Sequence, residues 1–162
     1  MTDPGRWLGR DELLSVVTLA PLVSIDLVVT SPSGEVLVGK RVNRPARDTW
    51  FVPGGRILKG ERLRDAFARI ALAELGREVP YASARWMGAW DHVYDDNFAD
   101  VDGVGTQYIV LAHGLVLDLD LATLPPAQHR GYLWMPVADV LSRPDVHANT
   151  RAYFDGSAPS AG

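Results

Sequence analysis

One strongly helical segment stands between runs of residues that favour β-strands, and this arrangement constrains the fold most. From residue 62 to residue 75 apolar side chains recur along one helix face, and Gly76 marks the predicted end. Strand-forming runs precede this helix at residues 22–30 and follow it at residues 85–93 and 106–117. Strands on both sides of a helix predict an α+β fold in which helices cover a mixed sheet.

Weaker patterns extend this prediction to the rest of the chain. They predict a short helix at residues 9–17, a hairpin at residues 22–41, and short strands at residues 50–52 and 132–135. One or two short helices are expected after the last strand, before Phe154. The chain, residues 1–162, has the length of a single domain. Within it we expect an N-terminal helical segment at residues 1–20 and a disordered, small and polar tail at residues 156–162.

The charge and residue content exclude several classes of protein. Sixteen Lys and Arg against 20 Asp and Glu give a net charge of −4, which is unlike a nucleic-acid-binding surface. The absence of Cys excludes disulfides, thiolate metal sites and thiol nucleophiles. Because no 18-residue apolar run and no signal-peptide pattern is present, we expect a cytoplasmic protein without a membrane partner. Arg outnumbers Lys by 14 to two, which either a codon preference or anion binding explains.

A glutamate lies where the predicted helix should be apolar. Glu74 falls in the middle of the face that also carries Leu63, Ala66, Phe67, Ile70 and Ala71. A carboxylate buried there has to be paired, protonated or bound to a metal ion, because an unpaired buried charge costs too much free energy. The alternative is that Glu74, in the last turn, reaches solvent or an Arg.

A glycine pair, Gly54 and Gly55, precedes this helix, and Arg56 and Lys59 follow the pair closely. Glycines let a ligand approach the backbone, and the two cations suit an anion. A Gly-Gly pair alone usually marks only a turn, so its significance depends on its spacing to the helix.

That spacing resembles a known motif. The Nudix box, a loop–helix–loop that binds a divalent metal ion on a diphosphate, is similar to the set Gly55, Glu61, Arg69, Glu74 and Gly76. The resemblance implies a Nudix-like α/β/α sandwich. The box usually carries two further carboxylates, at positions where this chain has Ile70 and Ala73. One box glutamate is too few for a cluster of metal ions, and the box then lacks a base for water attack on phosphorus.

The altered box resembles the GDP-mannose mannosyl hydrolases, a Nudix branch that cleaves the sugar C–O bond instead of the P–O bond. The similarity extends to residues 21–26, 39–46, 50–56, 92–98, 128–129 and 146–154. It implies a homodimer that hydrolyses GDP-mannose, or GDP-glucose, to GDP and free sugar with Mg²⁺. Direct water attack at C1 predicts inversion. The alternatives are an ordinary Nudix pyrophosphohydrolase attacking phosphorus of a nucleotide sugar, and an inactive module that binds nucleotide sugars.

The resemblance also implies a metal site. One Mg²⁺, for which Mn²⁺ can substitute, would be held by the backbone carbonyl of Gly54 and the side chains of Glu74 and Gln128. A neutral Gln is a suitable hard-oxygen ligand when the substrate phosphates supply the negative charge.

Three arginines and a tyrosine are implied at the phosphates. Arg41 and Arg56 would neutralise the departing phosphate, Arg69 would orient the site from the helix, and Tyr108 would hydrogen-bond phosphate or sugar. For each Arg the alternative is a solvated surface charge.

Among the histidines, His129 is implied as the base, because imidazole titrates near neutrality and this one lies in a polar loop. Asp26 is implied near the reacting sugar, with Arg41 or sugar hydroxyls as its partner, and His92 is expected to touch the sugar. His113 is expected in the core or a dimer contact, and His147 in a structural role. The candidates to stack guanine, unless they belong to the core, are Trp50, Trp86, Trp90 and Trp134.

Overall fold

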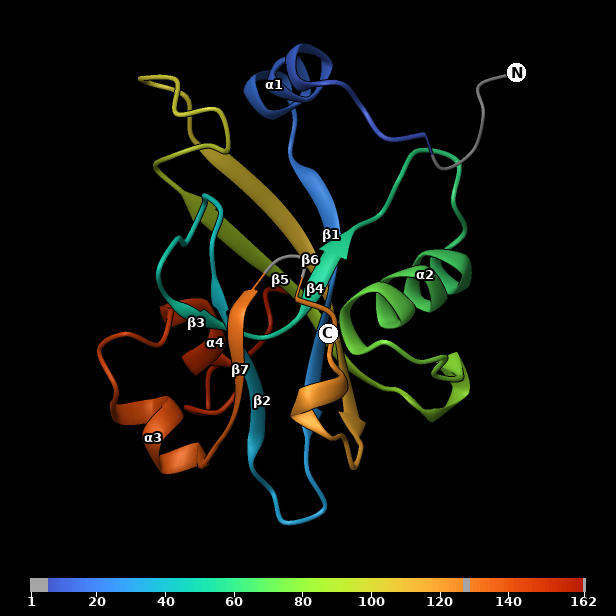
Figure 1. Ribbon diagram of the computed structural model, residues 1–162. Coiled ribbons are helices and arrows are strands. Elements are labelled where there is room, and N and C mark those ends of the chain that lie inside the picture. Colours follow the sequence, from blue (N-terminus) through green and yellow to red (C-terminus); the bar gives the residue numbers. More distant parts are fainter. Residues whose placement is uncertain (1–5, 127–128, 162) are drawn as a thin grey trace.

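The computed structural model describes residues 6–126 and 129–161 and confirms the α+β fold (Figure 1). Its elements in chain order are α1 (Arg10–Leu19), β1 (Leu22–Thr30), β2 (Val36–Arg41), β3 (Trp50–Phe51), β4 (Gly54–Arg56), α2 (Leu63–Leu75), η1 (Tyr81–Ser83), β5 (Arg85–Tyr94), β6 (Thr106–Val116), η2 (Leu121–Thr123), β7 (His129–Met135), α3 (Val137–Ser142) and α4 (Ala148–Ala152). The predicted long helix agrees with α2, which ends at Gly76 with a φ of 67°. Glycine adopts this left-handed conformation readily.

The strands form one mixed sheet in which β1 is central. The order is β3-β2-β1-β6-β5, with β4 paired to β1 and β7 paired to β2. β1 pairs in parallel with β6 along its whole length. The hairpin predicted for residues 22–41 forms only next to its turn, where Thr30 pairs with Val36. Beyond that point β2 pairs with β7 and β3, and β4 takes its place beside β1.

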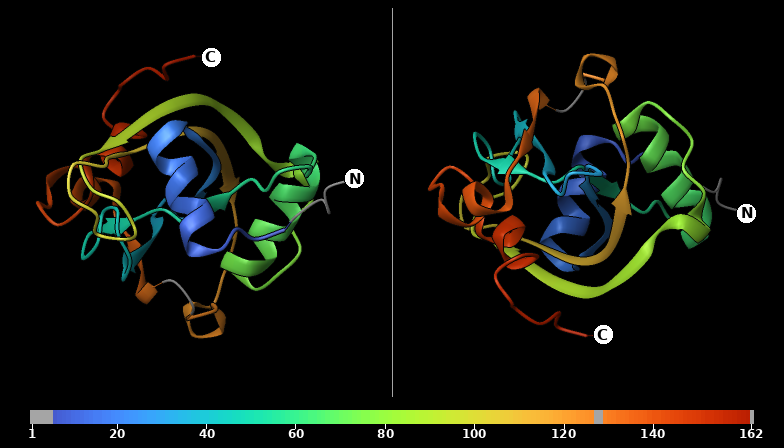
Figure 2. Two further views of the ribbon diagram at one scale, coloured as in Figure 1. Left: turned by 90° about the horizontal axis from the view of Figure 1, so that it is seen from above. Right: turned by 90° about the horizontal axis from the view of Figure 1, so that it is seen from below.

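Helices cover both faces of the sheet, as an α/β/α sandwich requires. Figure 2 shows α2 on one side of the strands and α3 and α4 on the other. The apolar core beneath α2 includes Ile25, Leu27, Phe67, Ile70 and Leu75, and the core beneath α3 includes Val36, Val38, Met135 and Val140. In residues 6–126 and 129–161, none of the helices has both the length and the apolar character that a bilayer crossing requires.

The predicted glycine loop is a short strand, β4, and this corrects the sequence interpretation. Gly54 and Gly55 pair with Asp26 and Ile25 of β1. A Cβ at Gly54 would lie 2.5 Å from the carbonyl oxygen of Ile25, and one at Gly55 would lie 3.1 Å from Cγ1 of Ile70. The two glycines are therefore needed for close packing between β1 and α2, which places β4 where its backbone lines a cavity.

The C-terminal residues lie along β5, which differs from the disorder predicted for residues 156–162. The backbone of Ala161 exchanges two hydrogen bonds with Ala89, and Ser160 Oγ accepts a hydrogen bond from the backbone N–H of Asp91. Pro159 packs on Gly88, where a Cβ would lie only 2.5 Å from the proline ring. The small residues of this segment therefore allow it to pack closely on β5. Gly162 lies outside the described residues.

Candidate functional site

A cavity of about 220 Å³, called the cleft below, lies between α2, β4 and the central strands. Its lining includes most of the predicted site residues, namely Asp26, Arg41, Gly54, Arg56, Arg69, Glu74, His92 and Tyr108. These residues come from β1, β2, β4, α2, β5 and β6, so the order of the sheet and the packing of α2 on it bring them together. A second cavity of about 520 Å³ adjoins the cleft and shares Arg41, Arg56 and Tyr108 with it.

Asp26 is the single carboxylate of β1 and is buried, with 6% of its surface exposed. Its hydrogen-bond partner is the hydroxyl of Tyr153, which donates to Oδ2 over 2.7 Å, rather than the Arg41 or sugar expected from the sequence. Burial raises the pKa of Asp26 to about 7, although the Tyr153 hydrogen bond and the charge of Arg41 oppose this shift. The charge of Glu74 raises this pKa further, which shows that two carboxylates share the cleft.

Two buried nitrogen atoms lining the cleft, Arg41 Nε and His92 Nε2, have no hydrogen-bond partner among the described residues. Such atoms cost free energy unless a ligand or water binds them. His92 is only 3% exposed, and burial lowers its pKa to about 4, so its imidazole is neutral at physiological pH. A neutral imidazole and a guanidinium suit hydroxyl and phosphate oxygens, respectively.

Tyr108 lines the cleft together with the phosphate-binding candidates Arg41 and Arg56. Burial raises the pKa of its hydroxyl, and the charges of Arg56 and Arg41 counteract this effect. The tyrosine therefore lies within electrostatic reach of both guanidinium groups and remains a neutral hydrogen-bond donor at the cleft.

The face of α2 that meets the cleft contributes one carboxylate. Glu74 is 4% exposed, so the alternative that it reaches solvent is wrong. Ile70, at the position of a usual box carboxylate, is buried in the core and packs on Gly55. Ala73 lines the cleft without a polar group. The helix thus provides one carboxylate at its end but no second carboxylate along the same face.

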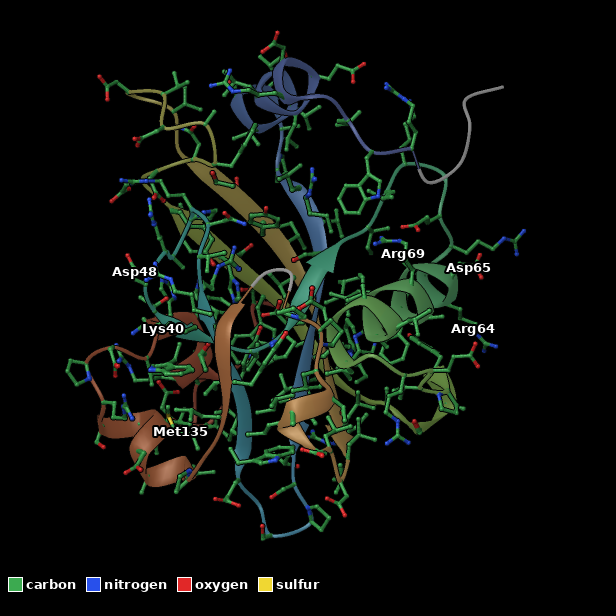
Figure 3. All side chains as sticks on the ribbon, in the orientation of Figure 1. Lys40, Asp48, Arg64, Asp65, Arg69 and Met135 are labelled. Atoms are coloured by element: carbon green, nitrogen blue, oxygen red, sulfur yellow. The ribbon has the colours of Figure 1, made fainter. Side chains whose placement is uncertain are left out.

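Arg69 is a positioning residue that fixes the β4–α2 connection. Its guanidinium donates to both carboxylate oxygens of Glu61, over 2.6 and 2.8 Å, and to the backbone oxygen of Arg56 over 2.8 Å. Glu61 also accepts a hydrogen bond from the backbone N–H of Leu58. Figure 3 shows Arg69 on the side of α2 toward β4, whereas Arg64 projects from the outer side. These bonds hold Arg56 in place from the helix.

The predicted base, His129, is placed by its backbone alone. His129 begins β7, where its backbone is registered with Arg41, so its assignment to a loop is wrong. Its side chain, and all of Gln128, lie outside what the structure describes. The remaining histidines are structural: His113 is buried against Phe67 and Tyr81, and His147 caps α4.

The four tryptophans considered from the sequence lie outside the cleft lining. Trp90 and Trp134 pack in the interior, Trp50 donates to Asp145, and Trp86 packs edge-on to His113. Sequence reasoning missed two aromatic residues instead, Tyr153, which holds Asp26, and Trp7, which lines the cleft. Tyr153 lies within residues 146–154, which resemble the mannosyl hydrolases, so that similarity could have indicated it. Trp7 precedes every stretch with such a similarity, so the sequence did not indicate it.

Comparison with known proteins decides the family. The sequence model of the NUDIX domain matches residues 20–155, which is most of the chain. The chain belongs to the Nudix hydrolase family. The low-salt glycan biosynthesis protein Agl8 of Haloferax volcanii is 44% identical to this Nudix protein over 118 residues, which cover 72% of each chain.

Solved structures share the Nudix fold at lower sequence identity. The MutT protein of Methanosarcina mazei Go1 matches with a TM-score of 0.61 at 20% identity, over 83% of this chain and 91% of that one. The NUDIX domain of Shewanella oneidensis NrtR, solved as a complex with ADP ribose, matches with a TM-score of 0.60 at 21% identity, over 90% and 96% of the two chains. These neighbours confirm the α/β/α sandwich.

Nudix hydrolases generally use a divalent metal ion such as Mg²⁺. The cleft fits such an ion, because its lining brings the hard-oxygen carboxylate of Glu74 together with the backbone of Gly54. Across residues 6–126 and 129–161, however, no group of three His, Asp or Glu side chains is arranged to enclose a metal. Phosphate oxygens and water would have to complete the coordination, which is the manner in which Mg²⁺ is commonly bound.

Proposed function

We propose that this Nudix protein hydrolyses a GDP-sugar, GDP-mannose or GDP-glucose, at C1 of the sugar, to give GDP and free sugar with inversion. The observation that carries the proposal is the distribution of carboxylates in the cleft. The box helix supplies only Glu74, with Ile70 and Ala73 at the other box positions, while a second carboxylate, Asp26, comes from β1. The box lacks the further carboxylates that usually serve attack on phosphorus, whereas Asp26 suits positive charge that develops on a sugar ring.

The leaving group is the first requirement of this reaction. When the C1–O bond breaks, its electron pair goes to the β-phosphate oxygen of GDP. Arg41 and Arg56 are the cations that would neutralise this charge, and Tyr108, which lines the same cleft, would donate a hydrogen bond. Glu74, the Gly54 carbonyl and Gln128 would hold one Mg²⁺, which stabilises the negative charge of the diphosphate. Mn²⁺ is expected to substitute.

The sugar is the second requirement. Asp26, held by Tyr153, would face the ring and stabilise oxocarbenium-like charge at C1. The unpartnered Nε2 of His92 is available to a sugar hydroxyl. His129, whose backbone is registered with Arg41, would accept the proton of the water whose oxygen forms the new bond to C1.

The relatives support a nucleotide-sugar substrate. The name of Agl8 refers to glycan biosynthesis, a process that consumes activated sugars. The NrtR domain was solved with ADP ribose, a nucleoside diphosphate joined to a sugar. Both fit a cleft in which arginines and a sugar-facing carboxylate lie together.

A product assay tests the proposal. The protein is incubated with GDP-mannose, GDP-glucose, UDP-glucose and ADP-ribose, with Mg²⁺ or with a chelator, and the products are separated by chromatography. We expect GDP and free sugar, only with the metal ion, and the inverted anomer by proton NMR. GMP with sugar phosphate would establish the pyrophosphohydrolase instead, and binding without turnover would establish the inactive module.

A further inference from the structure

We propose that Asp48 is a positioning residue, which through its ion pair with Arg130 holds the start of β7 on β2 and so fixes the backbone of His129. This inference rests on the proposed function, in which His129 is the base. Asp48 lies in the connection between β2 and β3 (Figure 3). Its Oδ1 accepts a hydrogen bond from Nη2 of Arg130 over 2.7 Å. The pair therefore joins this connection to the strand that begins at His129.

β7 contains a bulge next to His129. Its register with β2 is regular as far as Tyr132, which lies opposite Gly39, and resumes at His129, opposite Arg41. Between these two pairs β7 has two residues, one of them Arg130, where β2 has one. An extra residue is left out of the pairing and changes the direction in which its neighbours point. The direction of His129 thus depends on how this bulge is held.

Asp48 is itself anchored to the strand opposite His129. Its backbone N–H donates to the carbonyl oxygen of Arg41 over 3.0 Å, and the N–H of Arg41 donates to the carbonyl oxygen of Thr49 over 3.0 Å. Asp48 has a φ of 64°, a left-handed conformation that Asp and Asn adopt more readily than most residues. Its carboxylate therefore connects the backbone of a predicted phosphate-binding residue, Arg41, with the segment that carries the predicted base.

The ion pair is exposed, so we expect it to affect geometry more than stability. The side chains of Arg130 and Asp48 are 59% and 58% exposed, and exposed ion pairs contribute little to the free energy of unfolding. Catalysis is more sensitive to position, because a displacement of about 1 Å can lower a rate about 100-fold. Removal of the pair therefore predicts slower turnover without a comparable loss of stability.

Asp48→Asn tests the pair, because asparagine suits the left-handed backbone and removes the charge. With GDP-mannose as substrate we expect kcat to fall about 3- to 10-fold. The Kd for GDP with Mg²⁺ should stay within about twofold, and the melting temperature within about 3 °C. Asp11→Asn is the matched control, since it removes another exposed, ion-paired carboxylate, and it should keep the wild-type kcat.

Variants of Arg130 test whether the two residues act through one contact. Arg130→Gln should lower kcat by the same factor as Asp48→Asn, and Arg130→Lys, which keeps the charge, should recover most of the loss. The double variant Asp48→Asn/Arg130→Gln should be no slower than either single variant. Additive losses would overturn the positioning role, because Arg130 would then act on the substrate independently of Asp48.

Hydrogen–deuterium exchange provides a readout that does not depend on the reaction. Asp48→Asn should increase exchange of the backbone amides at residues 129–132 and leave exchange in β5 unchanged. If His129→Gln abolishes turnover, unchanged kcat or unchanged exchange in Asp48→Asn would overturn the positioning role alone. Normal turnover in His129→Gln would instead overturn the proposed base, and with it any role for Asp48 in the reaction.

Discussion

At the scale of single residues, the proposed chemistry depends on how Asp26 is held. A carboxylate inside an otherwise apolar strand is visible in the sequence, and its need for a partner follows from the cost of burying charge. The identity of that partner is not visible, because Tyr153 is 127 residues away and reaches Asp26 only through the packing of the C-terminal segment on the sheet. The sequence therefore predicts the carboxylate but not its orientation.

Tyr153→Phe tests this role. The variant loses the hydrogen bond to Oδ2 of Asp26, and a hydrogen bond to a charged group contributes about 1.5–3 kcal/mol. We expect kcat to fall about 10- to 100-fold while KM changes little, because the carboxylate is no longer oriented toward the sugar. Tyr81→Phe, which removes a hydroxyl next to His113 and outside the cleft, should leave kcat unchanged. Equal kcat in the Tyr153 variant and the wild type would exclude the positioning role.

His129→Gln tests the base. Glutamine keeps a polar side chain of similar length but cannot accept a proton near neutral pH, so kcat should fall by about 10²- to 10⁴-fold with little change in substrate affinity. Steady-state kinetics and GDP titration measure the two effects separately. His113→Gln, in the core, controls for the loss of an imidazole. Near-normal turnover in the His129 variant would refute its assignment.

At the scale of elements, local patterns predicted α1, α2 and the long strands because periodicity and terminating residues are local properties. β4 was missed since three residues with two glycines carry no strand pattern, and its formation depends on close contact with Ile25 and Ile70. The link between β4 and α2 is the Glu61–Arg69 pair, which the box spacing indicates but whose hydrogen bonds only the structure shows.

Glu61→Gln and Arg69→Gln should each lower the free energy of unfolding by about 2–3 kcal/mol, because either change leaves a largely buried partner uncompensated. The double variant should lose little more than either single one, which urea unfolding at pH 7 measures as a coupling energy. Arg69 lowers the pKa of Glu61, so the pair stabilises the protein above the ordinary pKa of a glutamate. This stabilisation is lost as the pH falls through the lowered value. The exposed Glu78→Gln is the control. Two results would contradict the coupling: a double variant whose loss of unfolding free energy equals the sum of the single losses, or single losses no larger than that of Glu78→Gln.

At the scale of the whole molecule, sheet order is the property that the sequence could not supply. The parallel pairing of β1 with β6 joins segments 86 residues apart in sequence, as Leu22 and Tyr108 show, and the antiparallel pairing of β6 with β5 sets His92 opposite Tyr108. The site residues were predicted through family resemblance, and most of them meet in one cleft. The homodimer and the cytoplasmic location stay predictions.

The pH dependence of stability follows from the burial of titratable side chains in the folded protein. The folded protein holds His92 neutral down to a pKa of about 4, while an unfolded histidine titrates near 6.5. Between these values the unfolded state binds more protons, so stability falls as the pH decreases, by about 3 kcal/mol for this residue. The raised pKa of Asp26 has the opposite effect, because it increases stability as the pH decreases. The contribution of His92 is therefore measured by comparing a His92 variant with the wild type.

His92→Gln removes the histidine contribution and leaves that of Asp26. The melting temperature of the variant, relative to the wild type, should therefore rise as the pH is lowered from 7 to about 4.5. Calorimetric melting across this range measures the difference. A difference that stays constant with pH would show that His92 does not remain neutral in the folded protein.

The proposed reaction requires that water attack carbon and not phosphorus. Product identity alone does not distinguish the two, since attack on the β-phosphorus would also release GDP and sugar. Hydrolysis of GDP-mannose in H₂¹⁸O followed by mass spectrometry tests the claim most directly. Attack at C1 predicts ¹⁸O in the free sugar and none in GDP. Label in a phosphate, with unlabelled sugar, would contradict the account.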